Sequence, residues 1–175
     1  MAVVEATIFQ IAGYQNSGKT TFIKKLLEQL QKSNLSVVTL KHHGHGGKPD
    51  FQDGKDSHQH LKAGAVASLV EGDGHLLLHA ERKMWSLPEK LQLLSFFQPD
   101  IILIEGHKRE PYPKAVLIRT RDDLDLLMKL ENSKVIFFWD KELMNETKEY
   151  QGLKKFTIND PEGLKWLVNY LSFKK

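Results

Sequence analysis

An eight-residue segment near the N-terminus, Gly13-Tyr14-Gln15-Asn16-Ser17-Gly18-Lys19-Thr20, constrains the fold more than any other feature of the chain. It fits the pattern G-x-x-x-x-G-K-[ST] of a phosphate-binding loop. Residues 6–12 before it are β-prone and apolar, and residues 21–30 after it carry apolar side chains at helical spacing. A loop between a strand and a helix N-terminus directs backbone N–H groups and the helix dipole toward one point. The segment therefore predicts a site for nucleotide phosphates.

The residue types in this loop suit a bound triphosphate. Gly13 and Gly18 permit backbone angles and a close approach that a β-carbon would obstruct. Lys19 is predicted to hold its ammonium against the β- and γ-phosphates, and Thr20 to offer a hydroxyl to Mg²⁺. The loop amides and the helix start add further phosphate-binding candidates, Asn16, Ser17 and Thr21. The alternative is an ordinary glycine-rich turn at a helix start.

The alternation of strand-like and helix-like segments predicts an α/β fold of the P-loop NTPase class, a mostly parallel sheet flanked by helices. Apolar runs at 100–104, 115–119 and 135–139 are typical of strands buried on both faces, and residues 35–40 are expected to form another strand. Short strands at 65–70 and 75–79, joined by a turn at 71–74, are expected as an inserted antiparallel pair. Helices are expected at 57–62, 86–97, 121–130 and from 160 onward.

Composition limits the remaining possibilities. A chain of 175 residues can bury one core, so a single domain over residues 1–175 is expected. The chain has no cysteine, which excludes disulfides, thiolate zinc sites and cysteine-ligated iron–sulfur clusters. The first residues lack a basic segment, and no apolar run approaches the roughly 18 residues of a membrane span. The absence of cysteine fits a reducing compartment, so we expect a cytoplasmic protein without membrane partners. The net charge of +3 is modest, so we expect no nucleic-acid partner.

A second acidic site follows the apolar run at 100–104. Glu105 and Gly106 end this expected strand, and ligands of open α/β sheets bind beyond the carboxyl ends of strands. In phosphate-loop proteins an acidic residue at this place holds the Mg²⁺ shell. Glutamate is one methylene longer than the usual aspartate, so direct and water-mediated contacts are both open. The alternative role is a helix cap or a surface acid.

The polar stretch from Lys41 to Ser57 is expected to be a loop at the same edge of the sheet. It carries His42, His43 and His45 with the carboxylates of Asp50, Asp53 and Asp56. Such a loop could close over phosphate and metal, with Asp50 or Asp53 ordering a water molecule. The alternatives are a surface loop and, for the histidines, a transition-metal site, although their spacing matches no firm metal motif.

With these segments placed, the chain resembles the molybdopterin-guanine dinucleotide biosynthesis adapter family, MobB. The phosphate loop is shared by a vast class and selects no family. The ordered set of further motifs is much more specific: Lys41-His42 with His45, Gly54-Lys55-Asp56-Ser57, Lys62-Ala63-Gly64-Ala65 and Leu103-Ile104-Glu105-Gly106-His107-Lys108. Two departures stand out. His107 occupies a place that is often aromatic, and Tyr14 and Gln15 stand where some dimeric relatives carry an extra lysine.

The resemblance implies a GTP-binding protein with weak GTPase activity, usually a homodimer. Such proteins assist the MobA-type guanylyltransferase, which attaches GMP to the molybdenum–pterin cofactor. By this likeness Lys19, Asp53 and Glu105 would be the catalytic residues, and Thr20, Asp53 and Glu105 would hold Mg²⁺. Direct contact with molybdopterin stays open.

Guanine preference has the weakest support in the sequence. The chain has no N-K-x-D motif, and Asp140, at the end of the run 135–139, is the candidate acceptor for the guanine N–H groups. A helix-capping role for Asp140 is the alternative. Two other functions also remain: a small-molecule P-loop kinase with Asp53 or His42 as base, and a histidine-rich metallochaperone GTPase.

Overall fold

The computed structural model describes residues 6–42, 56–147, 150 and 152–173, with the backbone alone for 56–58. The chain divides into two compact units, Met1–His42 with Leu91–Lys175, and His43–Lys90. The division falls within helix α3 (Leu87–Ser95). Each unit is described in turn.

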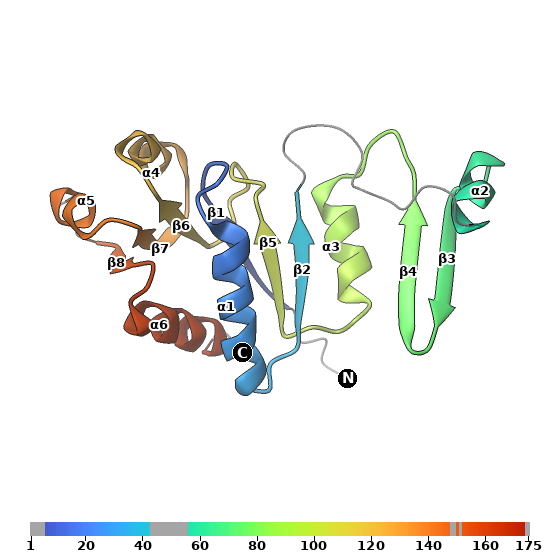
Figure 1. The fold of residues 1–175 in the computed structure, drawn as a ribbon, viewed down its shortest axis with the longest axis horizontal. Coiled ribbons are helices and arrows are strands. Elements are labelled where there is room, and N and C mark those ends of the chain that lie inside the picture. The colour runs from blue at the N-terminus through green and yellow to red at the C-terminus, as the bar shows by residue number, and fades with distance from the viewer. Residues whose placement is uncertain (1–5, 43–55, 148–149, 151, 174–175) are drawn as a thin grey trace. The chain divides into compact units, whose positions relative to one another are not determined.

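Within the described residues, the larger unit is built on a six-stranded sheet of order β2-β5-β1-β6-β7-β8, in which every neighbouring pair is parallel (Figure 1). The α/β, mostly parallel fold predicted from the sequence is therefore confirmed. Strand β8 had no counterpart in the prediction, because its sequence, KKFT, holds a single apolar residue. The strands are β1 (Thr7–Ala12), β2 (Val37–Lys41), β5 (Ile101–Glu105), β6 (Lys114–Ile118), β7 (Ser133–Phe138) and β8 (Lys154–Thr157).

Helices cover both faces of this sheet, which explains the continuous apolar runs of its strands. Helices α1 (Lys19–Lys32) and α6 (Pro161–Ser172) pack on one face, where Leu26 and Leu167 are fully buried. Helices α4 (Asp125–Lys129) and α5 (Lys141–Glu146) pack on the other. Alternate strand residues serve the two cores: Phe9, Leu103, Leu117 and Phe137 face α1 and α6, and Ala12, Val116, Ile136 and Phe138 face α4 and α5.

The helix predicted at 121–130 forms as two short pieces, a 3₁₀ turn η1 (Arg121–Leu124) followed by α4. Thr120 and Asp123 form a capping box at its start. Helix α5 was not predicted, since six residues are too few to show helical periodicity. Asp160 caps α6 with Pro161 in the first turn, as the sequence predicted.

Strand order brings distant segments to one edge of the sheet. Parallel strands end together, so the residues that follow β1, β2, β5, β6 and β7 all emerge at the carboxyl edge. The register places Glu105 beside Ile11 on one side and beside Lys41 on the other. This edge therefore carries the phosphate loop and the acidic residue expected to accompany it.

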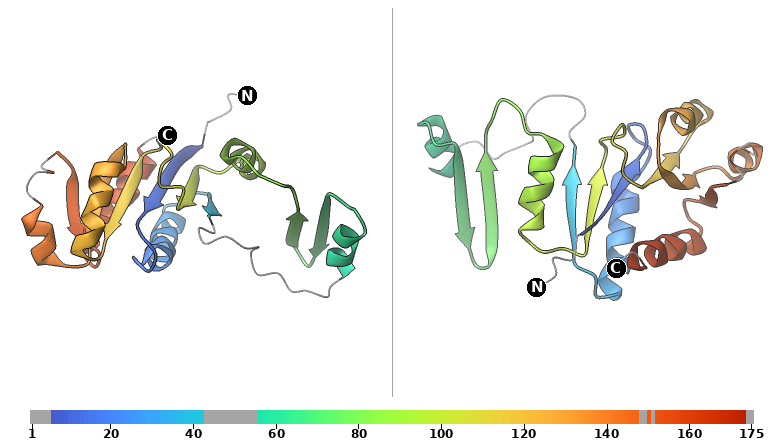
Figure 2. Two further views of the ribbon diagram at one scale, coloured as in Figure 1. Left: turned by 90° about the horizontal axis from the view of Figure 1, so that it is seen from above. Right: turned by 180° about the vertical axis from the view of Figure 1, so that it is seen from behind.

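The smaller unit contains helix α2 (Asp56–Lys62) and an antiparallel pair, β3 (Ala67–Gly72) and β4 (His75–Ala80). Figure 2 gives two further views of this pair, which is a sheet of its own. Asp73 and Gly74 connect the strands with positive φ values of 50° and 76°, as the tightest hairpin turns require. The predicted inserted pair is thus confirmed. After it, Ser86 and Glu89 form the predicted capping box at the start of α3.

Candidate nucleotide-binding site

The loop between β1 and α1 has backbone geometry that requires its glycines. Gly18 has φ of 85° and serves as the N-cap of α1, and Asn16 has φ of 59°. A β-carbon on Gly13 would lie 2.4 Å from Ser17 Oγ and 3.1 Å from the Leu117 carbonyl oxygen. The helix begins at Lys19, two residues before the predicted start, so the loop runs directly into the helix N-terminus. The structure thus has the strand–loop–helix arrangement that the sequence predicted, in which backbone N–H groups at a helix N-terminus suit an anion.

Two side chains from other strands brace the loop. Trp139, after β7, donates its indole N–H to the Ser17 carbonyl at 2.9 Å. Arg119, after β6, donates to the Asn16 carbonyl at 2.5 Å, and its guanidinium lies 5.5 Å from the centroid of the Trp139 ring. Sequence reasoning did not assign this bracing role to either residue. Their positions immediately after apolar strands could have indicated such a role, because side chains there reach the carboxyl edge of the sheet.

Lys19 is half-buried and bound to its own loop. Its ammonium donates to the Tyr14 carbonyl at 2.6 Å and to Ser17 Oγ at 3.4 Å. Burial lowers the pKa of Lys19, Glu105 opposes this shift, and the positive charges of Lys108 and Lys41 add to it. The attraction of a dianionic phosphate beside the ammonium would offset both the desolvation and the repulsion.

Thr20 and Glu105 meet at the carboxyl edge. Thr20 Oγ1 donates to Glu105 Oε1 at 3.0 Å, across 85 positions of sequence. The Glu105 side chain is 13% exposed, and Lys41 Nζ lies 3.6 Å from the same carboxylate oxygen. A hydroxyl and a carboxylate side by side form the hard oxygen donor set that Mg²⁺ prefers. The residues present therefore fit the predicted metal.

The segment after Glu105 is tied to its neighbours. Gly106 and His107 both have positive φ, and the Gln10 side-chain amide donates to their carbonyls at 3.3 and 2.8 Å. The His42 N–H donates to the Glu105 carbonyl at 3.0 Å, and the His42 and His107 rings lie 4.4 Å apart. The His107 ring thus contacts a second ring, in a tilted arrangement with an interplanar angle of 35°.

This segment also reaches the phosphate loop. Lys108 Nζ lies 4.2 Å above the centroid of the Tyr14 ring, and the Tyr14 hydroxyl donates to Asp125 at 2.9 Å. Tyr14 therefore links the loop to both the strand-end segment and α4.

The remaining predicted residues have different outcomes. Thr21 is exposed on the first turn of α1. Asp50, Asp53, His43 and His45 lie outside the described residues. Asp140 Oδ1 accepts the N–H of Glu142 at 2.8 Å as the N-cap of α5. Over the described ranges, no three or more His, Asp or Glu side chains gather as a metal-binding group.

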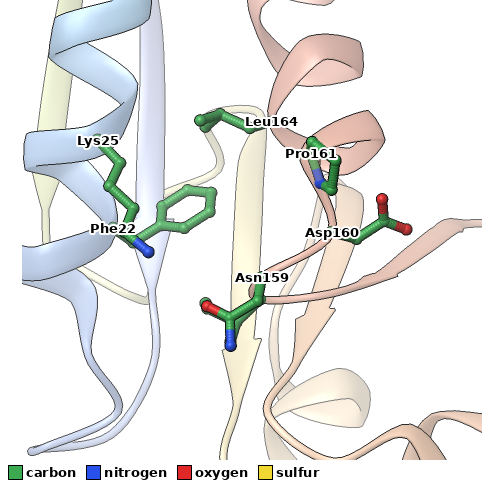
Figure 3. Close-up of a pocket in the computed structure, with 7 residues that line it drawn as sticks. Phe22, Lys25, Asn159, Asp160, Pro161 and Leu164 are labelled. Carbon is green, nitrogen blue, oxygen red and sulfur yellow. The ribbon is translucent and has the colours of Figure 1, made fainter.

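A small hollow lies beside the site, between α1 and the connection from β8 to α6. Figure 3 shows Phe22 and Lys25 on the α1 side and Asn159, Asp160 and Leu164 on the other. Its volume is about 80 Å³, well below the roughly 300–1,000 Å³ of typical small-molecule sites. The phosphate loop and Glu105 therefore remain the functional candidate.

The MobB family model, "Molybdopterin guanine dinucleotide synthesis protein B", matches residues 8–140, which include the loop, Glu105 and the bracing residues. The chain belongs to the MobB family. It is 41% identical over 165 residues to a probable molybdopterin-guanine dinucleotide biosynthesis adapter protein of Bacillus subtilis, covering 94% of this chain and 92% of that one. The resemblance expected from the sequence is thereby confirmed, and the kinase and metallochaperone alternatives gain no support.

Solved structures of MobB proteins share the fold. The crystal structure of Bacillus subtilis MobB matches with a TM-score of 0.81 and 43% identity, covering 93% of this chain and 96% of that one. A MobB homologue from Bacillus stearothermophilus matches with a TM-score of 0.75 and 32% identity, covering 95% of this chain and 98% of that one.

No helix within the described residues is long and apolar enough to cross a bilayer.

Proposed function

We propose that this protein binds GTP with Mg²⁺ and acts as an adapter in molybdopterin-guanine dinucleotide biosynthesis. The observation that carries the proposal is the hydrogen bond of 3.0 Å between Thr20 and Glu105, directly beside the loop that holds Lys19. It places the proposed phosphate-binding loop next to the oxygen pair that we propose holds the metal. The biosynthetic pathway is inferred from the relatives.

Each residue has a defined task in this proposal. The backbone amides of residues 16–20 and the α1 dipole would hold the β- and γ-phosphates, with the Lys19 ammonium against them. Thr20 Oγ1 and Glu105 would hold Mg²⁺, which when bound would neutralise phosphate charge. Trp139 and Arg119 would keep the loop in its receiving geometry through the Ser17 and Asn16 carbonyls.

Slow hydrolysis of GTP would follow from the same arrangement. Phosphoryl transfer to water depends on neutralising charge and orienting the water, with little covalent chemistry for the protein. Lys19, together with a Mg²⁺ ion held by Thr20 and Glu105, would neutralise the phosphate charge, and Asp53 is the candidate for orienting the water. Asp140 is the candidate acceptor for guanine, with Oδ1 engaged as a helix cap and Oδ2 as the oxygen to offer.

A second copy of the chain is the partner we propose for the β3–β4 pair. Apolar side chains are exposed on both of its faces: Leu69, Leu76 and Leu78 on one, and Val70 and Leu77 on the other. A two-stranded sheet is marginal alone, and among the described residues each strand pairs only with the other. Packing of one face against the same face of another subunit would bury one of these two sets. The MobA-type guanylyltransferase would then meet the dimer.

The test is a competition titration of GTP, ATP and GDP, with and without Mg²⁺, on the wild type and on Lys19→Ala. We expect Lys19→Ala to abolish nucleotide binding while the circular dichroism spectrum stays unchanged. Lys24→Ala, which removes an exposed lysine from the same helix, is the matched control and should bind normally. Unchanged GTP affinity in Lys19→Ala would refute the proposed site. A pull-down of guanylyltransferase then tests the adapter role.

A further inference from the structure

The backbone position of Lys41 is tightly set. It is the last residue of β2, and the register pairs it with Glu105 at the end of β5. The His42 N–H to Glu105 carbonyl bond continues this pairing by one residue. Paired residues on neighbouring strands lie about 4.8 Å apart and point to the same face. The Lys41 side chain is therefore held next to the Glu105 carboxylate.

The Lys41 ammonium reaches the oxygen pair expected to hold the metal. Nζ lies 3.6 Å from Glu105 Oε1 and 3.5 Å from Thr20 Oγ1. The Lys41 side chain is 60% exposed, so its long stem is free to move. Lys19 comes to the phosphates from the start of α1, whereas Lys41 comes from β2. The two ammoniums thus approach one site from different elements.

The charge balance here favours an added anion. The positive charges of Lys41 and Lys108 both repel the Lys19 ammonium, and the Glu105 carboxylate is the strongest opposing charge that acts on it. Positively charged side chains that are already close together before binding attract and stabilise a polyphosphate.

We infer that Lys41 is a second phosphate-neutralising residue, which leaves Glu105 when the nucleotide–metal complex binds and contacts the terminal phosphate of GTP. This inference rests on the proposed function. The ammonium cannot share Glu105 with a divalent cation without repulsion, and the terminal phosphate is the anion within reach of its stem. The residue would therefore distinguish GTP from GDP, which lacks that phosphate.

A purely structural ion pair makes a different prediction. An exposed lysine–carboxylate pair contributes little to stability, and its loss would change the affinities for GTP and GDP equally. The ratio of the two affinities thus separates the explanations.

The experiment measures GTP and GDP affinities at saturating Mg²⁺ for the wild type, Lys41→Met, Lys41→Arg and the control Lys24→Met. We expect Lys41→Met to weaken GTP binding about tenfold or more, as for loss of a charged hydrogen bond, and GDP binding by about threefold at most. Lys41→Arg should restore most of the GTP preference, and Lys24→Met should leave both affinities unchanged. Circular dichroism verifies that each variant is folded.

Equal losses for the two nucleotides, or no loss, would overturn the role of Lys41. If Lys41→Met is unfolded, the Lys41→Arg and Lys41→Gln pair carries the same comparison, because only arginine keeps the charge. Lys19→Ala, measured in parallel, shows whether the role of Lys41 alone or the proposed phosphate site as a whole is refuted. Loss of binding in Lys19→Ala with an unchanged ratio in Lys41→Met would refute this inference alone. Normal binding in Lys19→Ala would refute the phosphate site and this inference together.

Discussion

Replacing Gly18 with alanine should lower the free energy of unfolding by about 1.5–3.5 kcal/mol. Gly18 has φ of 85°, where a β-carbon costs about 1–2 kcal/mol. That carbon would also lie 2.6 Å from Cζ2 of Trp139, so the indole ring must move. The ring is anchored by the bond of 2.9 Å from its N–H to the Ser17 carbonyl, and losing this bond costs about 0.5–1.5 kcal/mol. The two terms together give the expected total.

The assay is urea-induced unfolding of Gly18→Ala, Trp139→Phe and the double variant, followed by far-UV circular dichroism. Trp139→Phe removes both the indole N–H and the ring that carries Cζ2. In its background Gly18→Ala should therefore cost only the backbone term, and the double variant should be less destabilised than the sum by about 1 kcal/mol. Gly74→Ala is a useful control, because Gly74 has φ of 76° but open space around it.

Two results would refute this reasoning. A cost below about 0.5 kcal/mol for Gly18→Ala would show that the loop tolerates a side chain and is not strained as described. Strict additivity of the two substitutions would show that the Trp139 ring does not restrain Gly18. GTP affinity gives an independent reading, since a displaced loop should bind more weakly even in buffer without denaturant.

The other two predictions concern the charged groups of the site. Glu105→Gln should weaken GTP binding with Mg²⁺ more than binding without it, because the amide is a poorer metal ligand; equal losses in the two titrations would make Glu105 structural. GTP affinity should also fall as the pH rises toward the ordinary lysine pKa of about 10.4, because burial lowers the pKa of Lys19 in the free protein and bound phosphate would raise it. Calorimetry in buffers of different ionisation enthalpy should detect proton uptake on binding in that range, and a GTP affinity that stays constant as the pH rises would contradict this assignment.

Several parts of the fold could be read from local sequence. The apolar runs marked β5, β6 and β7, and the turn at Asp73-Gly74 marked the antiparallel pair. Ser86 and Glu89 marked the start of α3 through a capping box. These signals work because turn and cap chemistry depends on residues only a few positions apart.

Other parts were beyond such reasoning. Strand β8 has little apolar content of its own and forms by pairing with β7. Helix α5 is short, and Asp140 caps its start. The sequence alone could not distinguish this capping role of Asp140 from a role in guanine binding. In both cases the secondary structure depends on contacts with other parts of the fold, which the local spacing of apolar residues does not reveal.

The octapeptide alone predicts that a phosphate loop joins the first strand to the first helix, because glycine, lysine and threonine at this spacing carry the chemistry within one segment. The surroundings of that loop are set by the folded chain. Strand order brings Glu105 and Lys41 to the Thr20 hydroxyl, and places Arg119 and Trp139 against the carbonyls of the loop. These residues lie far apart in the chain, and they meet because parallel strands end at a common edge.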